Sequence, residues 1–228
     1  MMMRFFLPLL LLLSPFFISC SERRSVRIAV AVPLTGDIAP EGQGILRAVQ
    51  LAVERSRDAG KSPVSVEVVP FDDRADPDQA VHAANLIAAD PRFVAVIGHY
   101  NSGCAIAASR IYSQASLAMI SPSATNPQLT LQQLEPGWQR RNIFRMTPTD
   151  EVQGSFAAEY AVEAGLRRFL LVQDGTPYGK GIAQVFQSRL EVLGGKIARV
   201  EEISLGQRDF SPVLQRAKSA KPQALYCA

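Results

Sequence analysis

The residues of this chain best suited to chemistry lie in two short polar segments, Gly98-His-Tyr-Asn-Ser-Gly103 and Ile120-Ser-Pro-Ser-Ala-Thr-Asn-Pro127. Ser102 is expected where a helix starts, so that its hydroxyl and nearby backbone N–H groups favour a carboxylate. The hydroxyl of Thr125 and the carbonyl of Ser123 can accept hydrogen bonds from an ammonium group. Together these groups predict binding of a small zwitterion such as an α-amino acid.

Catalysis finds less support in the same residues. His82 lies on an expected helix with no acidic or nucleophilic partner at a suitable spacing, and His99 can orient a loop but lacks a Gly-x-Ser-x-Gly elbow beside it. The pair Asp72-Asp73 has no second cluster of metal ligands, so we expect it to solvate or cap the loop before Asp76. We therefore predict no enzyme activity, no catalytic residue, no metal and no cofactor.

Several segments keep two interpretations. Ser102 can merely cap its helix, and Ser121-Pro122 can merely form a turn. Tyr178 can stack on an apolar ligand side chain across a cleft or be a surface aromatic residue. The segment Glu41-Gly-Gln-Gly44 has two glycines of a dinucleotide fingerprint, but Arg47 stands in place of the third and no P-loop occurs. A flexible turn into a helix explains these two glycines better.

Alternating strands and helices position these segments. Apolar runs and helix breakers predict strands over 26–32, 64–69, 93–97 and 117–120, with helices over 42–59, 76–90 and 102–114. After an irregular stretch, 121–141, a crossing strand is expected over 142–146, helices over 151–164, 180–193 and 211–220, and strands over 169–172, 196–203 and 224–227. This order predicts an α/β fold with parallel sheets and helices on both faces. The polar segments then follow neighbouring strands at the edge where ligands bind.

The first residues fit a secretory signal peptide, because a basic start precedes an apolar run that is too short to span a bilayer. Ser19-Cys20 resembles a bacterial lipobox, which predicts lipidation of Cys20; ordinary cleavage nearby is the alternative. Cys104 and Cys227 are expected to be unpaired buried thiols, although the sequence leaves open whether they meet. The 24 basic and 21 acidic residues give a net charge of +3 without a basic stripe, so nucleic acid is not an expected partner.

A longer series of motifs points to a known family. The series is Ile28-Ala-Val-Ala-Val-Pro-Leu-Thr-Gly36, Phe71-Asp-Asp73, Asp76-Pro77, Val96-Ile-Gly-His99, Met119 to Pro127, Arg145 with Pro148 and Asp150, Gln153-Gly154, and Asp174 with Tyr178-Gly179. In this order, the motifs resemble the type I periplasmic solute-binding proteins, specifically the branched-chain amino acid (leucine/isoleucine/valine) binding family of ABC importers. The resemblance runs from about residue 26 to the last residue.

The resemblance implies roles for individual residues. The residues matching Ser102 and Thr125 hold the ligand's carboxylate and ammonium in that family, the match to Ser123 contributes its carbonyl, and the match to Tyr178 lines the cleft from the other lobe. Glu41 stands where an aromatic residue often packs on the ligand side chain, which would suit a polar or cationic ligand. Tyr100 is a second candidate for contact with that side chain.

The resemblance also implies an organisation and partners. We expect a signal peptide over 1–19, a lipid-anchor linker over 20–25, a first Rossmann-like lobe over 26–145 and an incomplete second lobe over 146–228. Ligand binding would close the lobes about a hinge near Arg145 to Gln153, in the periplasm at the membrane, with delivery to ABC permease subunits. Because the family chain is longer, we expect a truncated chain with weakened affinity. A ligand-sensing regulatory domain of the same fold and a non-functional fragment are the alternatives.

Overall fold

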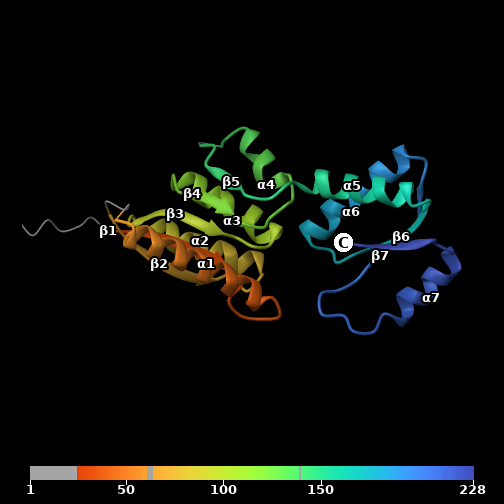
Figure 1. Ribbon diagram of the computed structural model, residues 1–228, viewed down its shortest axis with the longest axis horizontal. Coiled ribbons are helices and arrows are strands. Elements are labelled where there is room, and N and C mark those ends of the chain that lie inside the picture. Colours follow the sequence, from red (N-terminus) through yellow and green to blue (C-terminus); the bar gives the residue numbers. More distant parts are fainter. Residues whose placement is uncertain (1–24, 61–63, 139) are drawn as a thin grey trace, which may run out of the picture.

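The computed structural model describes residues 25–60, 64–138 and 140–228. They form two α/β lobes, each built on its own parallel sheet and lying one after the other along the longest axis (Figure 1). The predicted signal peptide and Cys20 lie outside the described residues. Within the described ranges, no helix combines the length and the apolar character that crossing a membrane requires.

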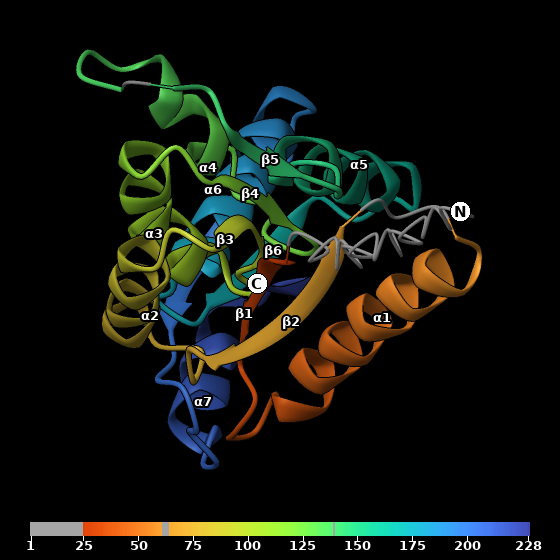
Figure 2. The ribbon, with the colours of Figure 1, turned by 90° about the vertical axis from the view of Figure 1, so that its left-hand side faces the viewer.

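The first lobe is built on a five-stranded sheet in the order β2-β1-β3-β4-β5, in which all neighbouring strands are parallel. The strands are β1 (Ser25–Val32), β2 (Ser65–Asp72), β3 (Phe93–Gly98), β4 (Ala118–Ser121) and β5 (Ile143–Arg145). One face is covered by α1 (Ala39–Asp58) and the other by α2 (Pro77–Ala89) and α3 (Ser102–Gln114), as Figure 2 shows. The predicted parallel sheet with helices on both faces is confirmed.

The core of this lobe lies between the sheet and the pair α2 and α3. Small side chains of β1, Ala29 and Ala31, are fully buried there beside alanines of both helices. Short residues bring helix and sheet backbones close together, and Tyr112 fills the larger space between them. This packing fixes the start of α3, where Ser102 lies.

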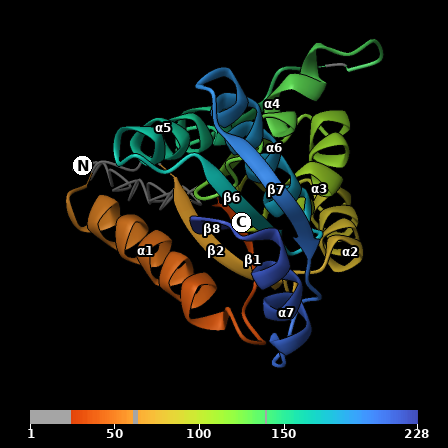
Figure 3. The same cartoon turned by 90° about the vertical axis from the view of Figure 1, so that its right-hand side faces the viewer.

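The second lobe has a three-stranded parallel sheet in the order β7-β6-β8 (Figure 3). Its strands are β6 (Arg168–Gln173), β7 (Lys196–Glu202) and β8 (Ala224–Cys227), and its helices are α5 (Asp150–Glu163), α6 (Pro177–Val192) and α7 (Ser211–Ala220). Successive side chains of the central strand alternate between two cores. Phe169 and Leu171 pack under α5 and α6, whereas Leu170 and Val172 pack under α7.

Two helices begin earlier than the sequence predicts. Helix α1 includes the segment expected to be a turn, because Gly42 lets the helix approach the carbonyl of Pro33 where a Cβ would overlap it. Helix α6 begins at Pro177 rather than near residue 180, because the Thr176 hydroxyl accepts a hydrogen bond from the N–H of Gly179. Tyr178 therefore lies in the first turn of a helix and not in a preceding loop.

Other expectations differ in detail. The stretch 121–141 is not wholly irregular, since it contains α4 (Gln128–Leu131) and a short 3₁₀ helix (Gln132–Leu134). The strand expected to cross between the halves is β5, which pairs with β4 as an edge of the first sheet. Cys104 is a buried free thiol as expected, but Cys227 is exposed because it lies on the edge strand β8. The residue boundary between the lobes stays a prediction.

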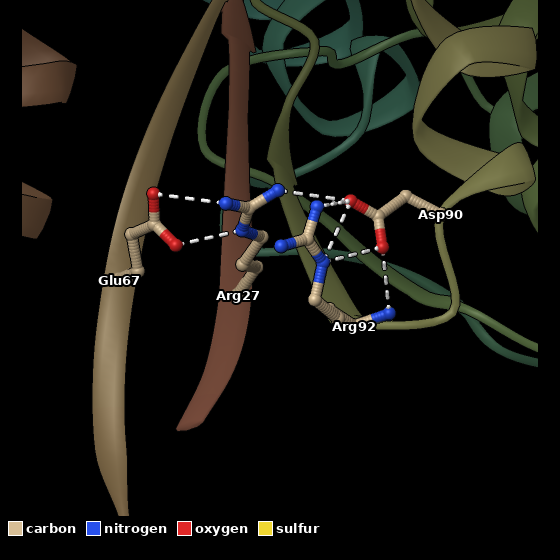
Figure 4. A network of polar contacts seen from close by, with 4 residues as sticks. All are labelled: Arg27, Glu67, Asp90 and Arg92. Atoms are coloured by element: carbon tan, nitrogen blue, oxygen red, sulfur yellow. Dashed lines mark hydrogen bonds and ion pairs between the residues drawn. The ribbon is translucent and has the colours of Figure 1, made fainter.

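A network of ion pairs ties together the strand starts, at the edge of the first sheet opposite the polar segments (Figure 4). The Arg27 guanidinium donates to Glu67 on β2 at 2.6 Å and to Asp90 at 2.9 Å. Arg92 donates to the same Asp90 carboxylate at 2.7 and 2.9 Å. The network thus joins β1, β2 and the turn that leads into β3.

We expect Asp90→Asn to lower the thermal unfolding midpoint at pH 7. Its hydrogen bond from Arg92 holds the pKa of Asp90 well below the ordinary value of 3.8. The stabilisation is therefore complete above pH 3.8 and is lost as the pH falls below it, because the unfolded chain then takes up a proton first. Circular dichroism melts should show a difference from wild type that shrinks in acid. Asp58→Asn is the control, since this exposed carboxylate lies 3.6 Å from Arg57.

Candidate functional site

The two polar segments meet at the carboxyl edge of the first sheet. They follow β3 and β4, which are neighbouring parallel strands. Ser102 is the first residue of α3, and its buried hydroxyl accepts a hydrogen bond from the backbone N–H of Asn126 at 3.3 Å. The side chain of Ser102 therefore does not cap its own helix; it joins the two segments.

A buried hydrogen-bonded chain lies beneath the first segment. Asp73 and His99 are fully buried and joined by a 2.6 Å contact between Oδ2 and Nδ1, and His99 Nε2 lies 3.1 Å from the Tyr112 hydroxyl. The carbonyl of His99 accepts a hydrogen bond from the Ser121 hydroxyl at 2.7 Å, and that hydroxyl accepts one from Ala124 N–H at 2.9 Å. This chain fixes the first segment and connects it to the second.

The two adjacent aspartates have separate roles. Asp72 accepts hydrogen bonds from the N–H groups of Leu34 and Arg74 and from the Thr35 hydroxyl, so it holds the loop as expected. Asp73 accepts one from a nearby loop N–H, but its other oxygen is the buried partner of His99. Both aspartates therefore hold the loop, as expected, but the sequence did not predict that Asp73 also pairs with His99.

The side chain of Arg145, at the end of β5, binds the backbone of the second polar segment. Its guanidinium donates to the carbonyls of Ala124 at 3.1 Å, Asn126 at 2.9 Å and Pro127 at 3.3 Å, and to the Thr130 hydroxyl at 2.8 Å. Burial lowers the pKa of Arg145 from its ordinary value, while two nearby carboxylates oppose this. A planar cation with several donors suits such a set of acceptors.

The same contacts reveal which backbone groups remain available. In the part of the chain that the structure describes, the N–H groups of Ser102, Gly103 and Thr125 donate to no protein acceptor, and the Ser123 carbonyl accepts from no protein donor. N–H groups at the start of a helix lack a partner within the helix. The two segments thus offer unused donors for an anion and an unused acceptor, with the Thr125 hydroxyl, for a cation.

The second lobe meets these segments with the start of α6. The side-chain amide of Asn126 donates to the carbonyl of Pro177 at 2.7 Å, and a Cβ on Gly103 would lie 3.4 Å from the Pro177 ring. Tyr178 follows directly, in the first turn of α6, and is 36% exposed. The helix starts of α3 and α6 therefore lie close to each other, one from each lobe.

Glu41 and Tyr100 are less clearly placed. Glu41 is exposed in the first turn of α1, which follows the carboxyl end of β1 and so lies at the same edge of the sheet. Tyr100 is half-buried within the first polar segment. Among the described residues, neither side chain has a hydrogen bond or ion pair.

Sequence reasoning missed the part played by Asp150, the first residue of α5. Its N–H donates to the Thr125 carbonyl at 3.0 Å, and its side chain is fully buried. Burial raises the pKa of Asp150, while a hydrogen bond with the Thr125 side chain and the charge of Arg145 act in the opposite direction. Its place in the motif of Arg145, Pro148 and Asp150 was the available signal.

Comparison with known proteins identifies the family of the chain. A family model described as periplasmic binding protein matches residues 25–228. The chain belongs to the periplasmic binding protein family. It is 36% identical over 204 residues to the Leu/Ile/Val-binding protein homolog 1 of Brucella melitensis, covering 88% of this chain and 53% of the relative. The chain thus spans about half the length of the curated relatives it matches.

Solved structures of the family show the same fold. A leucine-binding protein from Thermotoga maritima matches with a TM-score of 0.76 and 29% identity, covering 89% of this chain and 55% of that one. A branched-chain amino acid substrate-binding protein from Streptococcus pneumoniae, in complex with isoleucine, matches with a TM-score of 0.78 and 27% identity, covering 90% and 57%. These relatives are binding proteins and not enzymes, as the sequence predicts for this chain.

We expect Ser121→Ala to destabilise the chain by about 1–3 kcal/mol, because the buried His99 carbonyl loses its donor and Ala124 N–H loses its acceptor. Urea denaturation followed by circular dichroism measures the change. Ser219→Ala is the matched control, since its hydroxyl donates to the Arg216 carbonyl on an exposed helix surface. An equal loss in both variants would contradict a central role for the buried hydroxyl.

Proposed function

We propose that this chain is the extracytoplasmic ligand-binding component of an ABC importer and takes an α-amino acid, branched-chain or related, between its lobes. The observation that carries the proposal is the pattern of unused backbone groups. The N–H groups of Ser102, Gly103 and Thr125 and the carbonyl of Ser123 belong to the two polar segments, which the hydrogen bond between Ser102 and Asn126 joins. An α-amino acid presents a carboxylate and an ammonium separated by one carbon, and this pattern matches both groups.

The chemistry expected around the ligand's carboxylate and around its ammonium supports an α-amino acid as the ligand. The start of α3 carries the positive end of the helix dipole, which favours the ligand's carboxylate next to the Ser102 hydroxyl. Ser123 and Thr125 supply oxygen acceptors for the ammonium. Tyr178, in the first turn of α6 in the second lobe, would offer a flat apolar face to the ligand side chain. Glu41 and Tyr100, at the same edge, are candidates to contact that side chain.

Location and partners belong to the same proposal. Family membership implies a periplasmic location, and the expected signal peptide with Cys20 would tether the protein to the membrane by a lipid. Two lobes closing about the segment between Arg145 and Gln153 would enclose the ligand and present it to permease subunits. The relatives named as amino-acid binding proteins support this choice over an enzyme.

The direct test is calorimetry of the purified chain with the twenty common L-amino acids and with benzoate, a carboxylate that lacks an ammonium group. We expect heat of binding from at least one aliphatic amino acid and none from benzoate at the same concentration. Concentrations up to the millimolar range allow weak binding to be detected. Binding of benzoate with no response to any amino acid would overturn the proposal.

We expect Thr125→Val to weaken amino-acid binding about tenfold or more, because it removes a hydroxyl acceptor for the ammonium while keeping the shape of the side chain. Thr35→Val is the matched control, an exposed threonine at the same edge of the sheet whose hydroxyl donates to Asp72 at 2.5 Å. Calorimetry with the amino acid found above measures both. An unchanged affinity in Thr125→Val would exclude this hydroxyl from the site.

Lipidation of Cys20 can be tested independently of the ligand. We expect the chain expressed in a Gram-negative host to incorporate labelled palmitate and to partition into detergent, and Cys20→Ser to lose both properties. Cys227→Ser removes an exposed thiol on β8 and should retain both properties. Label in the Cys20→Ser variant would show that this cysteine is not the attachment point.

A further inference from the structure

Helix α5 carries apolar side chains on two opposite faces. Its small residues Ala158 and Ala161 are buried in the core that α5 and α6 share with β6. Its large residues Val152, Phe156 and Tyr160 lie on the other side and are 60%, 67% and 66% exposed. A helix at the surface of a globular protein normally turns its apolar stripe to the core and its polar face to water. The apolar outer face of α5 therefore indicates a surface that another polypeptide covers.

The exposed side chains of α5 form one continuous stripe, because they are spaced four residues apart along the helix. Helices α5 and α6 lie next to each other at the surface of the second lobe (Figure 3), and a groove of about 400 Å³ lies between them. Ser155 of α5 and Val192 of α6 are among the residues that line this groove, and Val192 is 75% exposed. The α5 face is defined here as Val152, Phe156, Tyr160 and Val192.

The area of the α5 face suits an interface between two copies of the chain. An aromatic side chain buries about 150–250 Å², so the exposed parts of the four residues amount to roughly 500 Å² in one copy and about 1,000 Å² in a pair. Stable protein interfaces bury about 1,200–2,000 Å² in total, and the polar residues around the apolar centre contribute to that area. Two copies therefore reach the size of a standard interface once the surrounding polar residues are included.

The order of residues on α5 fits a second copy of the helix in antiparallel orientation. A two-fold axis at Phe156 places Val152 of one copy opposite Tyr160 of the other, and Phe156 opposite Phe156. The same register places Glu159 opposite Gln153, and the other carboxylates of the helix also fall opposite uncharged residues. A parallel register would place Glu159 opposite itself, and like charges in contact oppose association. Charge therefore favours the antiparallel pair.

We propose that the chain forms a symmetric dimer through the α5 face, with the two α5 helices antiparallel about Phe156. Large aromatic residues near the centre of an interface contribute most of the binding free energy, so Phe156 is the expected anchor. Tyr160 of each copy would pack on Val152 of the other. None of the residues proposed to contact the ligand belongs to this face. The inference therefore goes beyond the proposed function and can fail or succeed independently of it.

Sedimentation velocity from low micromolar to millimolar concentrations tests for the dimer. We expect the wild-type chain to dimerise within this range, and Phe156→Glu to raise the dissociation constant of the dimer about tenfold or more. Leu205→Glu is the matched control, because it places the same charge at another exposed apolar side chain, in the turn between β7 and α7. It should leave the dissociation constant unchanged. Thermal denaturation should show equal unfolding midpoints for the two variants, since both positions are exposed.

Disulfide trapping tests the register in a chain that also carries Cys20→Ser and Cys227→Ser, which leave only a buried thiol. Dissolved oxygen with a copper catalyst accepts the two electrons and two protons that are released when two thiols join. Phe156→Cys should cross-link with itself, because the two-fold axis passes between the two copies of this residue. Val152→Cys and Tyr160→Cys should cross-link when the two variants are mixed, and much less when each is alone.

Three results would each overturn the dimer: a wild-type chain that stays monomeric throughout the concentration range, equal effects of Phe156→Glu and Leu205→Glu, or no cross-link in Phe156→Cys. A monomeric chain would assign the α5 face to a partner of different sequence. Val152→Cys and Tyr160→Cys that cross-link alone but not when mixed would contradict the antiparallel arrangement. Calorimetry with amino acids tests the proposed function separately, so that its failure is distinguishable from the failure of the dimer.

Discussion

The buried contact between Asp73 and His99 is the interaction on which the candidate site depends. It lies beneath the first polar segment, with Tyr112 on the far side of the imidazole, in a region closed to water. In such surroundings a polar group is stable only with its hydrogen-bond partners in place, so the geometry of these hydrogen-bonded side chains is tightly specified. The His99 carbonyl accepts a hydrogen bond from Ser121, which ties the second segment to the first. The two polar segments can then keep their unused N–H groups at fixed positions without a ligand.

The junction between the lobes follows a different physical rule. One of its contacts depends on an absent side chain, because a Cβ on Gly181 of α6 would lie 2.7 Å from the amide nitrogen of Asn126 in the first lobe. The same Asn126 amide donates to the Pro177 carbonyl. At these points the lobes meet through backbone and a short polar side chain.

Local patterns made much of the fold predictable. An apolar run predicts strand β3, and the polar segment after it predicts the start of helix α3. Asp76 caps α2 with its side chain, as the sequence indicates. The pairing of Asp73 with His99 could not be read in this way, because it joins residues 26 positions apart through the packing of α3 on the sheet. The same holds for the burial of Asp150, whose motif with Arg145 and Pro148 marks the position in the sequence but does not reveal that the side chain is buried.

The hydrogen bond from the Asp150 N–H to the Thr125 carbonyl has a mechanical consequence. Helix α5 belongs to the second lobe, yet its first N–H group is hydrogen-bonded to the backbone of Thr125, a residue of the proposed ligand site. A rotation of the second lobe therefore pulls on the Thr125 peptide itself, with no intermediate loop to absorb the movement. Ligand contact and lobe angle are then linked through one bond, and each must influence the other to the same extent, as thermodynamic reciprocity requires.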